Sequence, residues 1–196
     1  MQAVPVAEAE RERAFGTLTL SFAADPVERW LYPDPGRYLA SFPRFLAAFG
    51  GDAFAKGAAW QIDDFAAVAL WLPPGTPADG DAIVTVLTET VDPELHEDTF
   101  AVLEQMDQAH PDFAHWYLPW LGVDPSRQGR GLGGELLAAC LHTVDDDRLP
   151  AYLETPNPRT IPFYARHGFE VVGEAQAGAC PPMTLMLRPA RNASSR

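Results

Sequence analysis

The sequence predicts a single domain of the α/β (α+β) class with a mixed central sheet. The chain has 196 residues, of which 47% are hydrophobic, enough to bury one substantial core. In its C-terminal half the hydrophobic patterns alternate between strand and helix, and a strand, a helix and a strand in that order form a parallel pair with a crossover helix. An antiparallel hairpin is predicted ahead of this part.

The individual elements follow from hydrophobic periodicity and from turn residues. The expected strands are residues 3–6, 58–62, 66–72, 115–123, 151–154, 169–174 and 183–187. The expected helices are residues 8–24, 36–49, two within 80–109 that part at Asp92-Pro93, 131–144 and 159–167. Residues 29–35 are aromatic and broken by proline, and we interpret them as a packed loop or a short helix.

Breaker residues set the boundaries in the N-terminal half. The first helix is predicted to stop at Asp25-Pro26. The second carries one aromatic face, interrupted by Pro43, and stops at Gly50-Gly51. An aromatic face of this kind is typical of a core, and it can also wall a substrate cleft. Asp63-Asp64 joins the two strands of the hairpin, which ends at Pro73-Pro74.

Composition excludes several classes of function. A net charge of -13 argues against non-specific nucleic-acid binding, which needs a basic surface, and it would attract a cation such as a protonated amine. The N-terminal residues lack an apolar signal core, and no run approaches the ~18 apolar residues that span a bilayer, so we expect a cytoplasmic protein without a membrane partner. Cys140 and Cys180 have no CxxC neighbour and are expected to be reduced, and the sequon at Asn192 is discounted.

The stretch from His115 to Gly134 predicts an anion site, because a strand ends there at a proline turn and glycines then open a helix. Unpaired N–H groups at a helix start, together with the helix dipole, attract an anion. A nucleotide P-loop is excluded because no Lys-Ser or Lys-Thr follows the glycines. Gly129, Gly131 and Gly134 do fit the G-x-G-x-x-G dinucleotide fingerprint, but residues 124–126 separate them from the strand, where that turn would be tight.

A longer, ordered match favours a third interpretation. Residues 121–133, LGVDPSRQGRGLG, resemble the acyl-CoA-binding signature R/Q-x-x-G-x-G/A of the GNAT superfamily of N-acetyltransferases, with Gln128, Gly131 and Gly133 at its fixed positions. The second half of the superfamily pattern follows in order, in Leu153-Glu154-Thr155, Asn157, Phe163-Tyr164 and His167-Gly168-Phe169. Within the superfamily, residues 110–169 resemble puromycin N-acetyltransferase and its relatives in the order of their motifs.

This resemblance implies a GNAT fold, which is a mixed, mostly antiparallel sheet with one splayed parallel strand pair, flanked by helices. Residues 113–188 would form the acyl-CoA-binding half, residues 1–112 the half that shapes the acceptor site, and residues 189–196 a flexible tail. The aromatic side chains that we expect around the acceptor are Trp30, Tyr32, Phe42, Trp71 and Trp116.

The cosubstrate that the resemblance implies is acetyl-CoA. Its pyrophosphate would lie on the N–H groups of residues 129–133, with local positive charge from Arg127 and Arg130, and its pantetheine arm in the splayed gap. Asn157 would hydrogen-bond the CoA arm, or else it is a cap or turn residue. No histidine spacing resembles HExxH, so no metal is expected. The implied cofactor-binding residues are Leu121, Val123, Gln128, Gly129, Arg130, Gly131, Leu132, Gly133, Asn157 and Tyr164.

The implied reaction is direct attack of an amine on the thioester carbonyl. The backbone N–H of Val123 would stabilise the charge that develops on the carbonyl oxygen. Tyr164 would donate a proton to the leaving thiolate, which needs little help because a thiol pKa of about 8.5 lies below the ~10 of a phenol. An alkylammonium has a pKa near ~10, so its proton must be accepted, by Glu154 directly or through water, or by His115. Both residues also have ordinary structural roles, as a solvated glutamate and a core histidine.

We therefore expect an acetyl-CoA-dependent N-acetyltransferase that acts on a small-molecule amine, with a homodimer left open. The alternative is a CoA-binding regulatory or sensor protein of the same fold without turnover. Tyr164 argues against this alternative, because a pure binding protein has no need of that hydroxyl.

Overall fold

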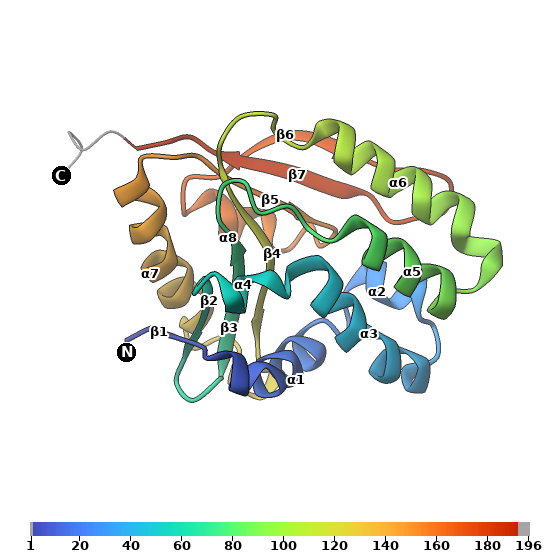
Figure 1. Cartoon of the computed structure of the whole chain (residues 1–196), viewed down its shortest axis with the longest axis horizontal. Coiled ribbons are helices and arrows are strands. Elements are labelled where there is room, and N and C mark those ends of the chain that lie inside the picture. Colours follow the sequence, from blue (N-terminus) through green and yellow to red (C-terminus); the bar gives the residue numbers. More distant parts are fainter. Residues whose placement is uncertain (1, 192–196) are drawn as a thin grey trace.

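One seven-stranded mixed sheet, in the order β1-β2-β3-β4-β5-β7-β6, runs through the computed structural model, which describes residues 2–191 (Figure 1). Neighbouring strands are antiparallel except for β4 and β5. The predicted mixed sheet with one parallel pair is thus confirmed. The strands are β1 (Val4–Pro5), β2 (Ala59–Ile62), β3 (Ala67–Leu72), β4 (Trp116–Val123), β5 (Ala151–Thr155), β6 (Glu170–Ala175) and β7 (Met183–Arg188).

Helices cover both faces of this sheet (Figure 1). They are α1 (Arg11–Ser21), α2 (Pro26–Leu31), α3 (Pro35–Gly50), α4 (Asp52–Ala55), α5 (Gly80–Thr90), α6 (His96–Ala109), α7 (Leu132–Asp147) and α8 (Ile161–Ala165). Short 3-10 turns stand at η1 (Glu8–Glu10), η2 (Pro93–Leu95) and η3 (Pro125–Arg127). On one face α7 packs against β2, β3 and β4, whereas on the other face α1 and α3 pack against β3 and β4. None of the helices within residues 2–191 has the length and apolar character needed to cross a membrane.

β3 separates two hydrophobic cores, because successive side chains of a strand point to opposite faces. Val68, Leu70 and Leu72 join the core shared with α1, α3 and α5. Ala67, Ala69 and Trp71 join the core shared with α7. Trp71 packs edge to face on Trp116 there, with ring centroids 6.4 Å apart. These two tryptophans, which we expected around the acceptor, thus belong to the core on the α7 face.

Asp25-Pro26 begins a helix, whereas the helix that we expected to stop there, α1, already ends at Ser21. The Asp25 side chain accepts hydrogen bonds from the N–H groups of Val27 (3.0 Å) and Glu28 (3.3 Å), and Pro26 takes the first position of α2. For residues 29–35 we expected a packed loop or a short helix. The structure has the short helix, α2, which begins three residues earlier, at Pro26. The unpredicted α4 follows directly on α3, because Gly51 keeps a right-handed helical conformation (φ -61°) instead of a left-handed stop.

The parallel strands β4 and β5 separate soon after they meet. Their pairing joins Trp116 to Ala151 and Tyr117 to Tyr152, and within these described strands it extends no further. Yet β4 continues to Val123 and β5 to Thr155. The splayed pair implied by the sequence is thus confirmed, and it leaves a gap in the middle of the sheet. The sequon at Asn192 and residues 192–196 of the predicted tail lie outside the described residues.

Candidate active site

The glycine segment after β4 forms a turn rich in free N–H groups. Gly129 and Gly131 have φ of 76° and 84°, in the left-handed region that glycine enters at little cost, and space is open beside both. Gly131 is the N-cap of α7, and the first bond of the helix ladder runs from Glu135 N–H to Gly131 O (3.0 Å). The N–H groups of residues 129–134 therefore have no backbone acceptor within residues 2–191. Such a set of donors at the positive end of a 16-residue helix fits a diphosphate.

The polar side chains of this segment have separate tasks. Gln128 donates a hydrogen bond from Nε2 to the carbonyl oxygen of Val123 (3.2 Å), which ties the turn to the end of β4. Arg127 pairs with Asp63 of the β2–β3 turn, so its charge is offset there. Arg130 is exposed on the glycine turn, and the side chain of Leu132 is buried. Of the two arginines, Arg130 is the one placed to add positive charge to the turn.

The backbone of β4 presents N–H groups to the gap. The N–H of Asp124 donates to Ala66 O next to β3 (2.9 Å). Because successive N–H groups of a strand alternate between its two sides, those of Val123 and Leu121 point away from β3 and toward the gap. These are the main-chain groups to which the family resemblance assigns the pantetheine arm of the cosubstrate.

Tyr164 belongs to the α7 face of the sheet. It extends from α8 into that core, is 8% exposed, and contacts Phe169 edge to face at 5.9 Å. Its hydroxyl makes no hydrogen bond with any residue of the described chain. Burial, and after it the charge of Asp25, raises the pKa of Tyr164. The phenol is therefore protonated at neutral pH and has a hydrogen to donate.

Glu154 belongs to the opposite face, because it follows Tyr152 by two residues on β5 and Tyr152 lies in the α1–α3 core. Its side chain is 4% exposed and stands 3.8 Å from Nδ1 of His110. His110 in turn contacts His115, with 3.0 Å between their Nε2 atoms. Burial lowers the pKa of His115. His115 thus reaches Glu154 only through His110, which the sequence analysis did not single out.

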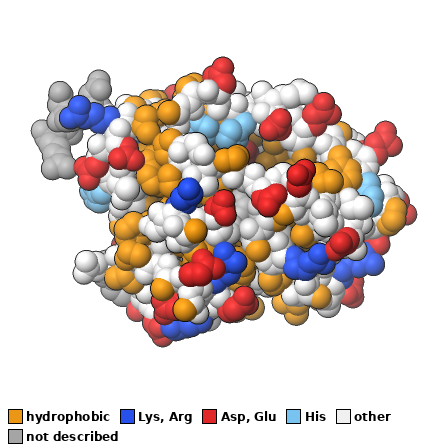
Figure 2. Space-filling view, in the orientation of Figure 1, with side chains coloured by type: hydrophobic (Ala, Val, Ile, Leu, Met, Phe, Trp, Pro, Cys, Tyr) orange, Lys and Arg blue, Asp and Glu red, His pale blue; other side chains and the backbone are white. Residues whose placement is uncertain are grey.

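Two hollows meet at Glu154. One is an apolar cavity of about 90 Å³ beneath the gap, walled by the rings of Phe22, Phe45, Phe49 and Trp120. The other is a wider groove of about 740 Å³ that runs past His110 and His115. Figure 2 shows histidine side chains beside a hollow that hydrophobic side chains border. Glu154 is therefore accessible from both sides.

Asp25 and Glu28 of the α2 turn also line the apolar cavity, and the sequence analysis missed both. Asp25 is 9% and Glu28 4% exposed. Burial raises the pKa of Asp25 to about 6, and burial with the nearby charge of Asp25 raises the pKa of Glu28 well above its usual range. The available signal was a pair of acids three residues apart in an aromatic segment, directly after an Asp-Pro helix start.

Asn157 stands where β5 leads into α8. Its side-chain oxygen accepts a hydrogen bond from the N–H of Arg159 (3.1 Å), which makes it a turn residue. Its contact with a cosubstrate stays a prediction. Within residues 2–191, no three His, Cys, Asp or Glu side chains gather in a way that could hold a metal ion.

Comparison with known proteins agrees with this geometry. A family model described as the acetyltransferase (GNAT) family matches residues 79–169. This segment thus matches the GNAT family of acetyltransferases, and the sheet has the GNAT fold. It is 26% identical over 132 residues to an uncharacterised N-acetyltransferase of Schizosaccharomyces pombe, covering 58% of this chain and 51% of that protein. It is 34% identical over 142 residues to mycothiol acetyltransferase of Beutenbergia cavernae, covering 68% and 48%. The chain thus spans about half the length of these relatives.

Solved structures of this GNAT fold extend over nearly the whole chain. The crystal structure of a histone acetyltransferase HPA2 and related acetyltransferase from Corynebacterium glutamicum has a TM-score of 0.69 at 22% identity and covers 98% of both chains. Arylalkylamine N-acetyltransferase 2 from Aedes aegypti has a TM-score of 0.66 at 14% identity, covering 97% of this chain and 99% of that one. At these identities the likeness is one of fold.

Proposed function

We propose that this protein transfers the acetyl group of acetyl-CoA to the amine of a small molecule by direct attack. The observation that carries the proposal is the gap between β4 and β5. It has a turn of free N–H groups on the α7 side and an acid-lined aromatic cavity on the other side. A thioester held in the gap would meet an amine that arrives from the cavity.

The α7 side would hold acetyl-CoA. The N–H groups of residues 129–133 and the charge of Arg130 would bind its diphosphate. The main-chain groups of Leu121 and Val123 would pair with its pantetheine arm, with Asn157 contacting the arm from the turn after β5. Gln128 would act mainly by fixing the glycine turn to β4.

Two groups would act on the reacting thioester. The N–H of Val123, which points into the gap, would stabilise negative charge on the carbonyl oxygen during attack. Tyr164 would give its proton to the sulfur as the carbon–sulfur bond breaks, so that CoA leaves as a thiol. Its hydroxyl, which has no partner in the described chain, suits this task because no protein acceptor competes for that hydrogen.

Glu154 would take the proton of the acceptor ammonium. Its carboxylate lies between the cavity and the groove, and His110, 3.8 Å away, leads on to His115. The proton could then pass to the groove through this histidine pair. His115 would thus act second in line and not as the direct base.

The cavity favours an amine attached to an apolar body, since aromatic rings form its walls and carboxyl groups its polar part. The name of the Aedes aegypti neighbour, an arylalkylamine N-acetyltransferase, agrees with such an acceptor. The motif order shared with puromycin N-acetyltransferase over residues 110–169 supports a similar donor half. We do not extend it to the acceptor, because most walls of the cavity come from residues before 110.

The proposal is tested by measuring CoA release from acetyl-CoA with a panel of primary amines, with mass spectrometry of the products. We expect release that depends on the amine, together with an N-acetylated product. Stabilisation of the protein against heat by acetyl-CoA, without turnover on any amine, would instead favour the binding or sensor protein.

A further inference from the structure

The side chain of Glu28 has no hydrogen-bond partner in the described chain, although it lines the apolar cavity. It is 4% exposed, it lines the cavity, and its Oε2 atom is fully enclosed with no partner in the described chain. Burying a carboxyl group without a donor costs free energy. A side chain in this condition indicates a ligand that supplies the donor.

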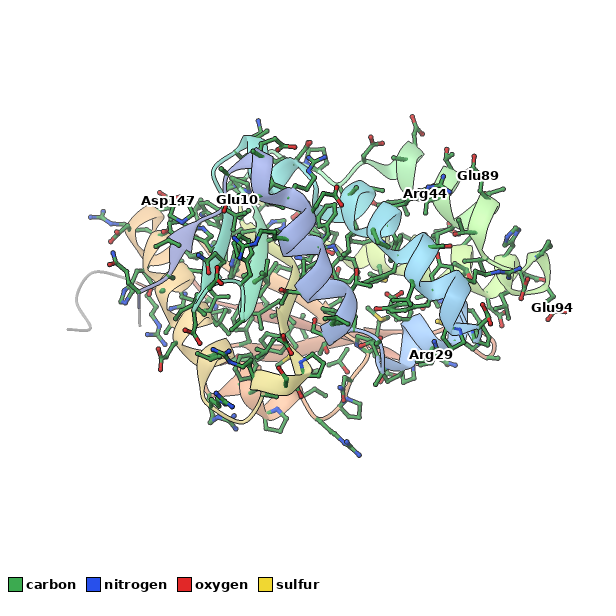
Figure 3. All side chains as sticks on the ribbon, turned by 90° about the horizontal axis from the view of Figure 1, so that it is seen from below. Glu10, Arg29, Arg44, Glu89, Glu94 and Asp147 are labelled. Carbon is green, nitrogen blue, oxygen red and sulfur yellow. The ribbon has the colours of Figure 1, made fainter. Side chains whose placement is uncertain are left out.

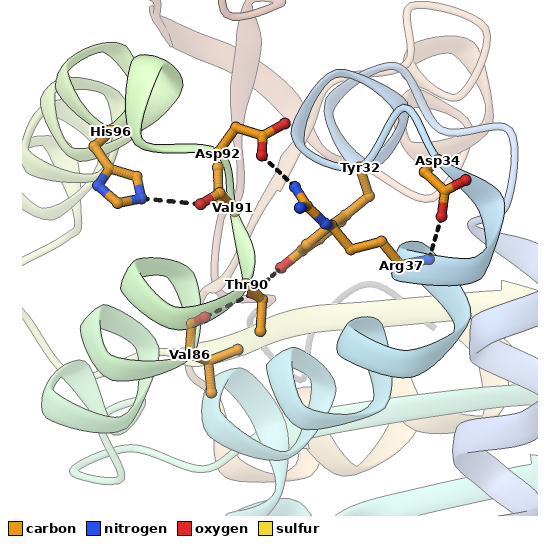
Figure 4. A network of polar contacts seen from close by, with 8 residues as sticks. All are labelled: Tyr32, Asp34, Arg37, Val86, Thr90, Val91, Asp92 and His96. Carbon is orange, nitrogen blue, oxygen red and sulfur yellow. Dashed lines mark hydrogen bonds and ion pairs between the residues drawn. The ribbon is translucent and has the colours of Figure 1, made fainter.

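The hydroxyls of Tyr32, Tyr38 and Thr99 are committed elsewhere, whereas Nε1 of Trp120, in the wall of the same cavity, has no partner in the described chain. The hydroxyl of Tyr32 bonds Thr90 (2.9 Å), as Figure 4 shows. The hydroxyl of Tyr38 donates to Thr19 O (2.6 Å), and that of Thr99 to Leu95 O (2.7 Å). No rotation of these hydroxyls satisfies Glu28 without breaking a bond that exists.

The nearby arginines are committed as well. Arg37 pairs with Asp92 (Figure 4), and Arg44 pairs with Glu89 at the surface (Figure 3). Arg29 donates to the carbonyl oxygen of Pro33. Moreover, no lysine, arginine or histidine lines the described cavity. None of these side chains is free to pair with Glu28, so a cation that pairs with its carboxylate would come from a ligand.

The acidic groups of the cavity act at separate places. In addition to burial, which is the larger cause, Glu28 and Glu154 each raise the pKa of two tyrosines, and the two sets do not overlap. The sets are Tyr32 and Tyr38 for Glu28, and Tyr117 and Tyr152 for Glu154. Asp25, which caps α2, and Glu28, three residues further along, reach the cavity from α2, whereas Glu154 reaches it from β5.

An acceptor with a single nitrogen would leave one of these acidic places empty. We propose that the acceptor is a diamine, whose reacting nitrogen lies at the gap beside Glu154 and whose second, protonated nitrogen pairs with Glu28. The apolar rings between the two places suit a hydrocarbon spacer. This inference rests on the proposed function and assigns Glu28 the choice of acceptor.

The test compares cadaverine, a five-carbon diamine, with n-pentylamine, which has the same chain and one nitrogen. With the wild-type chain and acetyl-CoA, we expect kcat/KM to be at least about tenfold higher for cadaverine, as a buried charge pair provides. Glu28→Gln should bring this ratio close to one, mainly by raising KM for cadaverine. Glu94→Gln removes the same charge from an exposed site (Figure 3) and should keep the wild-type ratio.

Equal kcat/KM for both amines in the wild type would overturn the proposal, whatever the variant does. So would a preference that survives in Glu28→Gln. If the wild type acetylates neither amine, the wider panel of amines decides the proposed function, and calorimetry decides the subsite separately. Cadaverine heat that is present in the wild type and lost in Glu28→Gln supports the subsite, and no heat in the wild type excludes it.

Discussion

In the proposed mechanism a single hydroxyl, that of Tyr164, distinguishes an enzyme from a binding protein of the same fold. The tyrosine is buried among Phe163, Phe169 and the rest of the α7 core, yet its hydroxyl has no partner in the described chain. For packing alone, a phenylalanine would serve as well. The hydroxyl therefore has its natural use in the proposed transfer of a proton to the leaving thiolate.

Replacing Tyr164 with phenylalanine should lower kcat by about ten- to hundredfold, because the thiolate would leave without a placed proton donor. The ring stays, so the affinity for acetyl-CoA should change less than about twofold. Steady-state kinetics give kcat, and calorimetry gives the dissociation constant. Unchanged turnover in a folded variant would remove Tyr164 from the mechanism.

For single residues, the sequence points to candidates that belong to a motif, but not to residues whose roles depend on tertiary contacts. Tyr164 and Glu154 are recognisable from motif order, and strand alternation then explains why Glu154 lies on the acceptor face. His110 and Glu28 were missed, because their roles depend on tertiary contacts. His110 matters through its 3.8 Å approach to Glu154, and Glu28 through burial by α3, α5 and α6.

Among the elements, the start of α7 would form the donor side of the proposed site. Gly131 caps this helix with φ of 84°, and its neighbours carry the free N–H groups. Its conformation disfavours most side chains, but asparagine and aspartate tolerate it better than others. These two residues are equal in size and differ in charge, which makes them a matched pair.

Gly131→Asp should weaken acetyl-CoA binding by at least about tenfold relative to Gly131→Asn, because a carboxylate would repel the diphosphate. Both variants share the cost of the left-handed conformation, so their difference isolates charge. Calorimetry gives the two dissociation constants, and a higher salt concentration should reduce the difference between them. Equal affinities for the two variants would contradict a phosphate site at this helix start.

Element boundaries were predictable where a single local signal decides them and not where two signals compete. The strands β2 to β5 lie within a residue of their expected limits. Asp25-Pro26 can stop one helix or start another, and only the side-chain bonds of Asp25 show that it starts α2. Gly50-Gly51 fits a stop equally well, but Gly51 keeps the chain helical into α4.

In the whole molecule, the two halves of the chain build opposite sides of one gap. The C-terminal half contributes the glycine turn, α7 and α8, and the N-terminal half contributes most of the rings of the cavity and two of its three acids, Asp25 and Glu28. The parallel pair was predictable from strand and helix order. The position of β7 between β5 and β6 was not, because long-range pairing leaves no local pattern in the sequence.

The C-terminal half is closed by a buried ion pair between β7 and α7. Arg188 is 2% exposed and binds Asp145 through both guanidinium ends, at 2.7 and 2.9 Å. Its Nε donates to the carbonyl oxygen of His167 (3.1 Å). One side chain thus joins β7, the last strand in the chain, to α7 and to the turn that follows α8. Tyr164 is in α8.

Asp145→Asn should lower the free energy of unfolding by about 2 to 3 kcal/mol, because it leaves the buried guanidinium without a counter-charge. We expect a value at the lower end of the range for buried pairs, since the Asp145 side chain is 28% exposed and water reaches it. Asp146→Asn removes the same charge from the next, exposed position and should change stability by less than about 0.5 kcal/mol. Urea denaturation at neutral pH measures both. Equal losses in the two variants would mean that net charge matters here, and not the bridge between β7 and α7.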